Sequence, residues 1–199
     1  IQANVSAAET LTAKRRPCMF RVHDEPDREK LEGLHDILSE MNISFAKGQV
    51  LKTATFNRIL AQTENETDRE LVSSLVLRSQ SQAVYSPENH QHFGLNLKKY
   101  AHFTSPIRRY ADLLVHRSLI SAHGFGSDGL TEEDAENLAD IGEMISGFER
   151  RAMAAERQTL DRFTAVFLAN RVNEIFQAKV TGVTRAGLFF SLEDTGADA

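Results

Sequence analysis

The sequence predicts an α+β fold that is mostly helical and ends in a short run of antiparallel strands. Three observations favour it. Apolar residues recur at helical spacing through most of the chain. No proline interrupts the stretch from Thr131 to about Arg171. After about Asn173 the residues become β-branched and aromatic, in short alternating runs. We therefore predict two parts, residues 1–171 and residues 172–199.

The amino-acid composition limits the classes of protein to which this chain can belong. The chain has 199 residues, of which 41% are hydrophobic and 26% charged, as in an ordinary globular protein. No apolar run approaches the roughly 20 residues that span a bilayer, so we expect no membrane segment. The single cysteine, Cys18, excludes an internal disulfide and favours a reducing, cytoplasmic setting. The net charge of -5 excludes a surface coated in positive charge but leaves room for a local basic channel.

Helices are expected through the first half of the chain. Residues 1–15 lack glycine and proline. Pro26 suits the first position of the next helix. Further apolar spacing and capping residues predict a helix with Leu31, Leu34, Leu38 and Met41 on one face, a short helix over 53–61, and a helix capped by Thr67. Between these helices we expect a short apolar run at 18–26, a turn at 85–89, and extended or looped chain at 92–104.

The stretch "HFTSPIRRYADLLVHRS" places two arginines at the start of a predicted helix. Ser105 is expected as its N-cap and Pro106 as its first residue, which puts Arg108 and Arg109 in the first turn. Free N–H groups and the positive end of the helix dipole favour anions there, and a cation costs up to about 1 kcal/mol. Two arginines at this end therefore indicate that a phosphate binds. Asp112, one turn later, would orient Arg108.

A plainer interpretation stays open for this stretch. Arg108 and Asp112 could form a surface salt bridge, with His116 a packed histidine. The apolar flanks favour a buried helix, in which arginines need partners. The aromatic rings around the arginines suit stacking on the bases of a single strand, or else belong to the core, as we expect for Phe103. These rings are Tyr100, His102, Phe103 and Tyr110.

Two other groups of polar residues carry weaker signals. His90 and His92 alone are a poor indication of a metal site, and we predict none. The acidic residues at 132–136 are expected to form a solvated helix start. Thr131 with Asp134 approximates a capping box for that helix. The helix would continue for about 40 residues, or roughly 60 Å.

The C-terminal strands are too few to stand alone. Two or three strands follow residue 173, and an isolated hairpin is marginal in water. The segment is therefore either the start of a larger barrel or a partly ordered tail.

The segment "HFGLNLKKYAHFTSPIRRYADLLVHRSL" closely resembles the signature near the end of the catalytic module of the ribonuclease II/ribonuclease R family. "ANVSAAE", "FRVHDEPD" and "ERRAMAAER" resemble other segments of the family, in the right order, over about residues 1–170. "FRVHDEPD" and "SPIRRY" are closer to its ribonuclease R branch. Residues after 173 resemble the opening of the OB-type RNA-binding barrel that follows in these enzymes.

The resemblance implies a function and roles for individual residues. The family are processive, magnesium-dependent exoribonucleases that degrade single-stranded RNA from its 3′ end to nucleoside 5′-monophosphates. Arg108 would contact the phosphates at the 3′ end as the catalytic residue. Glu156 would contact a 2′-OH, although without the resemblance we would interpret it as a glutamate on a helix surface. Phe189 would stack on a base or lie in the barrel core. The other expected RNA-binding residues are Ser105, Arg109, Tyr110, Tyr100 and His102.

One family feature is missing from the sequence. The aspartates that hold Mg²⁺ in the family lie upstream of anything matched here, and no D-x-x-x-x-x-D-x-D-D-like run occurs. Ala186 also stands where many such barrels carry a second aromatic. The chain starts at Ile1 rather than Met, so we expect a fragment that needs the upstream half of the module and is inactive alone. The alternatives are a non-catalytic RNA-binding relative and a helical interaction domain without an RNA role.

Overall fold

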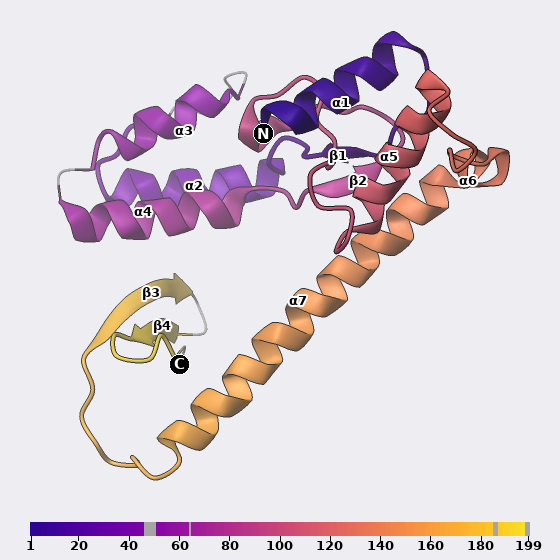
Figure 1. Ribbon diagram of the computed structural model, residues 1–199. Helices are drawn as coiled ribbons and strands as arrows, with labels where there is room; N and C mark the ends of the chain where they lie inside the picture. The colour runs from indigo at the N-terminus through magenta and orange to yellow at the C-terminus, as the bar shows by residue number, and fades with distance from the viewer. Residues whose placement is uncertain (46–50, 64, 185–186, 198–199) are drawn as a thin grey trace. The chain divides into compact units, whose positions relative to one another are not determined.

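The computed structural model describes residues 1–45, 51–63, 65–184 and 187–197. Its helices are α1 (Gln2–Ala13), α2 (Arg28–Glu40), α3 (Thr53–Leu60), α4 (Glu66–Ser79), the 3-10 helix η1 (Phe93–Leu95), α5 (Tyr110–His123), α6 (Glu132–Glu136) and α7 (Leu138–Leu168). Its strands are β1 (Phe20–Val22), β2 (Val84–Ser86), β3 (Ala178–Thr184) and β4 (Gly187–Leu192) (Figure 1). The predicted α+β class is confirmed. The chain divides into two compact units, Ile1–Gly147 and Phe148–Ala199, and the predicted division between residues 171 and 172 stays a prediction.

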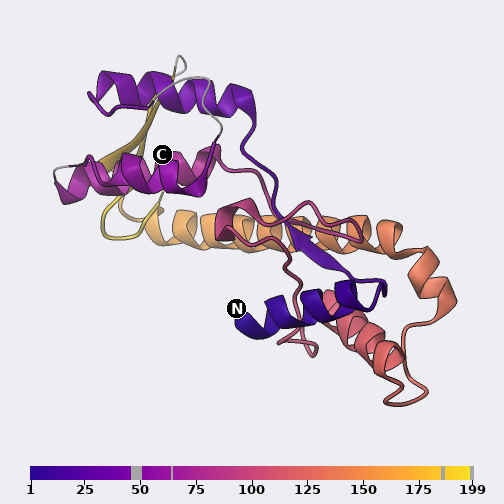
Figure 2. The same cartoon turned by 90° about the horizontal axis from the view of Figure 1, so that it is seen from above.

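The first core of the N-terminal unit lies around a small sheet. β1 and β2 pair antiparallel, with Arg21 opposite Tyr85. Helix α1 packs against α5 beside this sheet (Figures 1 and 2). The core consists of small and aliphatic side chains from all these elements, including Leu11, Met19, Val22, Leu114 and Val115. The sheet joins segments about sixty residues apart, and this pairing was not predicted.

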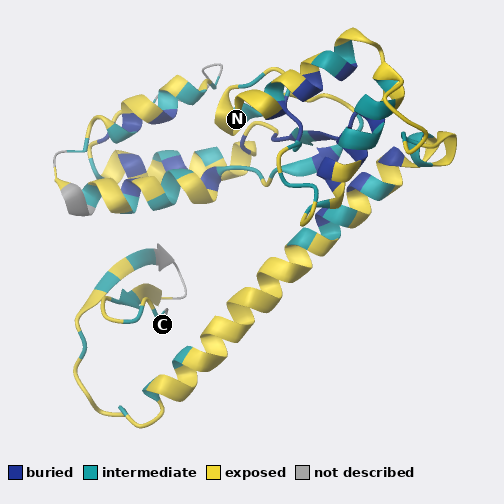
Figure 3. Cartoon of the chain, viewed as in Figure 1, coloured by how far each residue is buried: buried dark blue, intermediate teal, exposed yellow. Residues whose placement is uncertain are grey.

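The second core of the same unit is made by α2, α3 and α4, which pack together. Its buried side chains are Leu34, Leu38, Ile43, Phe56, Ile59 and Val72. Figure 3 shows these helices buried along one side and exposed along the other. The apolar spacing that predicted α2 is therefore confirmed, because Leu34 and Leu38 lie on the buried face, and the short helix predicted over 53–61 is observed as α3.

Two predicted helix starts are wrong by two residues. The side chain of Asp27 accepts a hydrogen bond from the amide of Glu29, so α2 begins at Arg28 rather than at Pro26. The side chain of Asn65 accepts from the amide of Asp68, which makes Asn65 the N-cap of α4 in place of Thr67. In both cases a side-chain acceptor upstream satisfies a free amide of the first turn.

The long C-terminal helix differs from its prediction. Thr131 caps α6, as expected, by accepting from the amide of Asp134. The helix then breaks at Asn137, whose side-chain amide donates to the carbonyl of Glu133 at 2.9 Å. The backbone amide of Asn137 donates to the same carbonyl at 3.1 Å, and with φ -93° and ψ 8° this residue is the C-cap of α6. α7 starts afresh at Leu138 and ends at Leu168, so the uninterrupted helix is shorter than the 40 residues predicted.

The predicted turn at 85–89 is partly strand, because Tyr85 and Ser86 belong to β2. Residues 92–104 are irregular chain with one 3-10 turn, as predicted. The irregular chain is held to the sheet, since the amide of Arg21 donates to the carbonyl of Tyr100 at 2.9 Å and Ala101 forms a bridge with Phe20. β1 therefore lies between β2 and the segment that leads into α5.

The C-terminal unit contains the predicted antiparallel hairpin. β3 pairs with β4, and the register shifts between Val180 and Gly182. Phe189 is 48% exposed and Phe190 is 37% exposed, so neither ring is buried by the described residues. A pair of strands has no opposite layer to bury both faces. Ala186 lies outside the described residues.

Candidate functional site

The arginine-bearing segment is a turn rather than the start of a helix. The amides of Arg108 and Arg109 both donate to the carbonyl of Ser105, at 3.3 and 3.1 Å. Arg109 then takes an extended conformation, with φ -131° and ψ 119°, and is the N-cap of α5, which begins at Tyr110. The predicted positions of Ser105 as N-cap and Pro106 as first helical residue are therefore wrong. Arg108 lies in the turn that precedes the helix.

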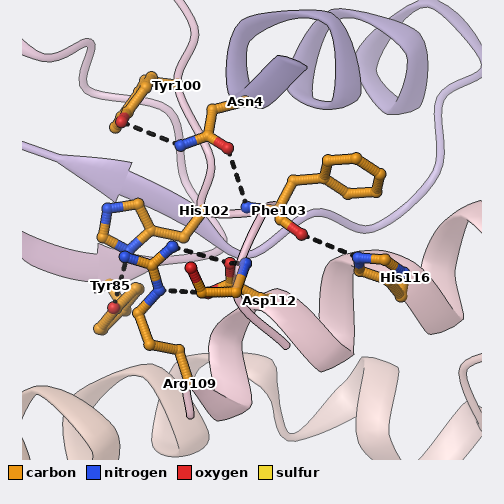
Figure 4. Close-up of polar contacts among 9 residues, drawn as sticks. Asn4, Tyr85, Tyr100, His102, Phe103, Arg109, Asp112 and His116 are labelled. Atoms are coloured by element: carbon orange, nitrogen blue, oxygen red, sulfur yellow. Dashed lines mark hydrogen bonds and ion pairs between the residues drawn. The ribbon is translucent and has the colours of Figure 1, made fainter. Parts of the chain in front are cut away.

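A buried carboxylate holds this turn. The side chain of Asp112 is 0% exposed and lies in the first turn of α5. It accepts hydrogen bonds from Nε of Arg109 at 2.7 Å, from Nη2 of Arg109 at 2.9 Å, and from the amide of Ser105 at 2.8 Å (Figure 4). We predicted that Asp112 orients Arg108, and this is wrong. The arginine bound to Asp112 is Arg109, which donates to both carboxylate oxygens.

The electrostatics of the pair follow from this geometry. Burial would raise the pKa of Asp112, but the hydrogen bonds from Arg109 and from the Ser105 amide, with the charge of Arg109, outweigh it and lower the pKa. The hydrogen bond to Asp112 raises the pKa of Arg109. Both groups are therefore charged at neutral pH, and their charges compensate each other.

Arg108 is different from its neighbour. Its side chain is exposed, as is that of Ile107 before it. Within the described ranges its guanidinium has no ion-pair partner. Tyr110 and Leu113, on the same helix start, are also partly exposed. α5 is thus not apolar and buried all round, and the turn presents one uncompensated positive charge at the surface.

Aromatic and imidazole rings lie next to the turn. His102 Nδ1 is 2.9 Å from the hydroxyl of Tyr85, and the His102 ring meets the Tyr100 ring edge-on at 5.7 Å. Burial, followed by the charges of Arg109 and Arg21, lowers the pKa of His102 to about 4. His102 is therefore neutral at physiological pH. Tyr100 is buried, whereas Tyr110 is 43% exposed and open to contact from outside.

The segment before the turn is clamped from two sides. From α1, Asn4 donates through Nδ2 to the hydroxyl of Tyr100 at 3.0 Å and accepts from the amide of Phe103 at 3.2 Å. From α5, His116 Nε2 lies 2.8 Å from the carbonyl of Phe103, and the two rings stack at 4.3 Å (Figure 4). The prediction that His116 is a packed histidine and Phe103 a core residue is consistent with these contacts.

Two residues of this cluster were not predicted as part of the site. Asn4 shares a helix face with Ala7, Ala8 and Leu11, so a polar residue on an apolar stripe was the signal available. Tyr85 comes from β2, and the guanidinium of Arg21 lies over its ring at 4.5 Å. No local pattern marks that pairing.

The remaining predicted residues belong to the other unit. Glu156 is exposed on α7, and Phe189 is on β4. The structure therefore brings Ser105 and Arg109 together at Asp112, with His102 and Tyr100 packed beside them. Tyr110 begins α5 with its ring exposed, and Glu156 and Phe189 are described separately.

The residues that the structure describes do not fit a Mg²⁺ site. They contain no group of three or more His, Cys, Asp or Glu side chains that could hold an ion. Asp112, the buried carboxylate of the site, has both oxygens hydrogen-bonded to Arg109. In the same ranges, no helix is long and apolar enough to cross a membrane.

An exposed arginine on a braced turn, beside neutral aromatic rings, is a candidate surface for a phosphate-bearing ligand. Comparison with known families then identifies the chain. The model of the RNB domain matches residues 1–123, so the chain belongs to the RNB domain family. The matched region ends with α5 and includes the whole of the turn and its clamp.

The chain is similar to several proteins described as ribonuclease R. The protein from Escherichia coli (strain K12) is 35% identical over 206 residues, covering 100% of this chain and 25% of its own length. The protein from Aquifex aeolicus (strain VF5) is 39% identical over 194 residues, covering 98% of this chain and 27% of its own length. The chain thus spans about a quarter of these relatives.

Solved structures show the same fold. Mycoplasma genitalium RNase R in complex with ribose methylated single-stranded RNA has a TM-score of 0.88 and 28% identity, with 100% of this chain and 32% of that chain covered. Yeast Ssd1, a pseudonuclease, has a TM-score of 0.78 and 22% identity, with 99% of this chain and 25% of that chain covered. The second likeness concerns the fold alone.

Proposed function

We propose that this chain is the C-terminal half of the catalytic module, with the start of an OB-type barrel, of a processive 3′-to-5′ exoribonuclease. The intact enzyme hydrolyses single-stranded RNA to nucleoside 5′-monophosphates. This part supplies the phosphate-binding turn and a portion of the RNA channel, and it is inactive without the upstream half. The observation that carries the proposal is the exposed Arg108 on its braced turn, inside the segment that matches the RNB domain.

The two arginines have different roles in this proposal. Arg108 contacts the phosphates at the 3′ end and stabilises the charge that develops as the phosphodiester is cleaved. Arg109 has Nε and Nη2 committed to Asp112, so it braces the turn and adds little direct contact to RNA. The exposed ring of Tyr110 stacks on an RNA base. Ser105, Tyr100 and His102 form the protein surface of the RNA channel next to the turn. Glu156 and Phe189 contact RNA from the second unit.

The metal belongs to the upstream half in this proposal. In the family, Mg²⁺ activates the attacking water and offsets negative charge at the phosphate. Aspartates of the upstream half would hold it, because the described residues offer no suitable cluster. The contribution of this chain is to bind and orient the RNA phosphate.

RNA binding by the chain itself is the first test. We expect single-stranded RNA to bind with an affinity that falls as salt rises, because each phosphate contact releases counterions. Arg108→Ala should reduce the slope of log K against log[salt] by about 0.7, the value for one contact on a single strand. Arg16→Ala is the matched control, since Arg16 is exposed in the loop that follows α1. Binding that does not respond to salt would favour a helical interaction domain instead.

Cleavage by the intact enzyme is the second test. Arg108→Ala should lower kcat about 100-fold or more with a much smaller change in KM, because other contacts still hold the strand. Equal losses in binding and turnover would make Arg108 a binding residue only. Magnesium-dependent release of monophosphates by this chain alone would contradict the proposed need for the upstream half.

A non-catalytic relative is the second candidate, since the fold also occurs in yeast Ssd1, a pseudonuclease. Tight RNA binding by the intact protein without any cleavage would favour it.

A further inference from the structure

Among the described residues, the hydrogen bonds to the buried carboxylate of Asp112 come from the two ends of one turn. The amide of Ser105 donates from its beginning, and the guanidinium of Arg109 donates twice from its end. Arg108 lies between these two anchors. Its own amide is bonded inside the turn, to the carbonyl of Ser105. The backbone of Arg108 is thus fixed at both sides while its side chain is exposed.

The local sequence favours a different conformation. Ser105 followed by Pro106 is a strong signal for a helix start, with serine as N-cap and proline at the first position. In such a helix the side chain of Arg108 would lie in the first turn. The structure instead has an isolated turn, an extended Arg109, and a helix that begins at Tyr110. The bond from the Ser105 amide to Asp112 is what the observed conformation has and the continuous helix would lack, because seven residues of helix would hold the two groups two turns apart. The Arg109–Asp112 pair has the i, i+3 spacing that a helix also allows, and in the turn it shares its carboxylate with that amide.

The Asp112 carboxylate also neutralises the charge of one of the two arginines and leaves that of the other. Asp112 compensates Arg109 in a nearly buried, two-point ion pair. It lies at the third position of α5, where a negative charge is favoured by the helix dipole. Arg108 keeps its full charge for an external anion. The structure therefore gives one arginine a structural partner and leaves its neighbour available.

We propose that Asp112 is a positioning residue, which selects the Ser105–Arg109 turn over the competing helix and thereby aims Arg108 at the RNA phosphate. The inference rests on the proposed function, because it requires that Arg108 contact the scissile end of the RNA. Asp112 itself does not touch RNA. It acts through Arg108, so removing Asp112 should lower the cleavage rate only when Arg108 is present.

A double-mutant cycle in the intact enzyme tests this dependence. The assay is single-turnover cleavage of a single-stranded RNA oligonucleotide by the wild type, Arg108→Ala, Asp112→Ala, Asp112→Asn and the corresponding double variants. Asp112→Ala should lower the cleavage rate about 100-fold, as expected when a catalytic group is misplaced by about 1 Å, with little change in KM. In the Arg108→Ala background, the same substitution should cost only about threefold or less, because the residue it positions is gone.

Two variants guard against effects on folding. Asp112→Asn keeps the shape of the side chain and an acceptor oxygen for the Ser105 amide but loses the charge that holds Arg109. It should fold, as judged by thermal unfolding, and lose less activity than Asp112→Ala. Asp140→Asn removes an exposed carboxylate of α7 and should leave the rate unchanged.

The outcomes separate the inference from the proposed function. If Asp112→Asn lowers the rate by the same factor with and without Arg108, Asp112 acts independently of Arg108 and the inference is wrong. If the wild type does not cleave RNA, or if Arg108→Ala cleaves as fast as the wild type, the proposed function fails and the inference fails with it. If Asp112→Ala does not fold, the cycle with Asp112→Asn decides.

Discussion

Helix α7 packs closely against the sheet at Gly142, and adding one methyl group there should destabilise the N-terminal unit. A Cβ at this position would lie 2.8 Å from the carbonyl oxygen of Tyr85 and 3.4 Å from the sulfur of Met19. The neighbouring Ser146 reinforces the contact, since its hydroxyl donates to the carbonyl of Gly142 at 2.7 Å and accepts from the amide of Tyr85 at 2.9 Å. The obstructing atom belongs to backbone and cannot rotate away.

The magnitude follows from two opposing terms. Alanine is a better helix former than glycine by about 1 kcal/mol, which would stabilise α7. Forcing a methyl group into a packed contact typically costs about 1–3 kcal/mol, and weakening the bond between Tyr85 and Ser146 costs about 1 kcal/mol more. We expect Gly142→Ala to lower the free energy of unfolding by about 1–3 kcal/mol net. For a chain of this length each kcal/mol corresponds to about 2–4 °C in Tm.

Gly147→Ala in the same helix is the matched control. No described atom lies within 4 Å of its added Cβ, so only the helix-propensity term applies. This variant should be more stable than the wild type by up to about 1 kcal/mol. Urea unfolding followed by circular dichroism measures both variants. A Gly142→Ala protein as stable as Gly147→Ala would refute the close contact between α7 and β2.

Three further predictions concern buried polar groups. Burial, as the largest cause, lowers the pKa of both His92 and His102 from 6.5 to about 4. The unfolded chain takes up these protons first, so the free energy of unfolding should fall between about pH 6.5 and pH 4. Both rings are only partly buried and solvent weakens the effect, so we expect about 1–2 kcal/mol for each histidine, and a flat profile in urea titrations would contradict this. Burial raises the pKa of Cys18 to about 12 and leaves the residue 3% exposed, so the native chain should resist a thiol reagent at pH 8 that labels the urea-unfolded chain at once. Asn4→Ala leaves the amide of Phe103 without its acceptor and should cost about 1–3 kcal/mol, visible as a lower Tm; an unchanged Tm would mean that the clamp does not stabilise the fold.

Local signals predicted the helices well and their starts less well. Leu34 and Leu38 repeat at helical spacing because they form one buried face, so α2 could be recognised from its own residues. The first residue of α2 could not be predicted in the same way, because Asp27 and Pro26 both suit a helix start. Only the hydrogen bond between the Asp27 side chain and the Glu29 amide decides between them. The hairpin at β3 and β4 was predicted because adjacent strands need only a turn between them.

The arrangement of the candidate site could be predicted only in part. The pair of arginines drew attention to this segment, and in the structure the rings of Tyr100 and His102 pack against each other just before it. The partner of the buried carboxylate was assigned to Arg108 and is Arg109. Residues 108 and 109 differ by about 100° around a helix, so a wrong helix start changes which of them meets Asp112.

The sequence by itself determined the family resemblance, the fold class, the helical faces and the presence of two adjacent arginines next to α5, because these depend on residue types and short spacings. The tertiary structure decided which arginine is braced and which is exposed. It did so by burying Asp112, whose carboxylate accepts hydrogen bonds from Ser105 and Arg109. Hydrogen bonds to a carboxylate without access to water are strong enough to override the local preference for a helix starting at Ser105. Only the folded chain removes that water.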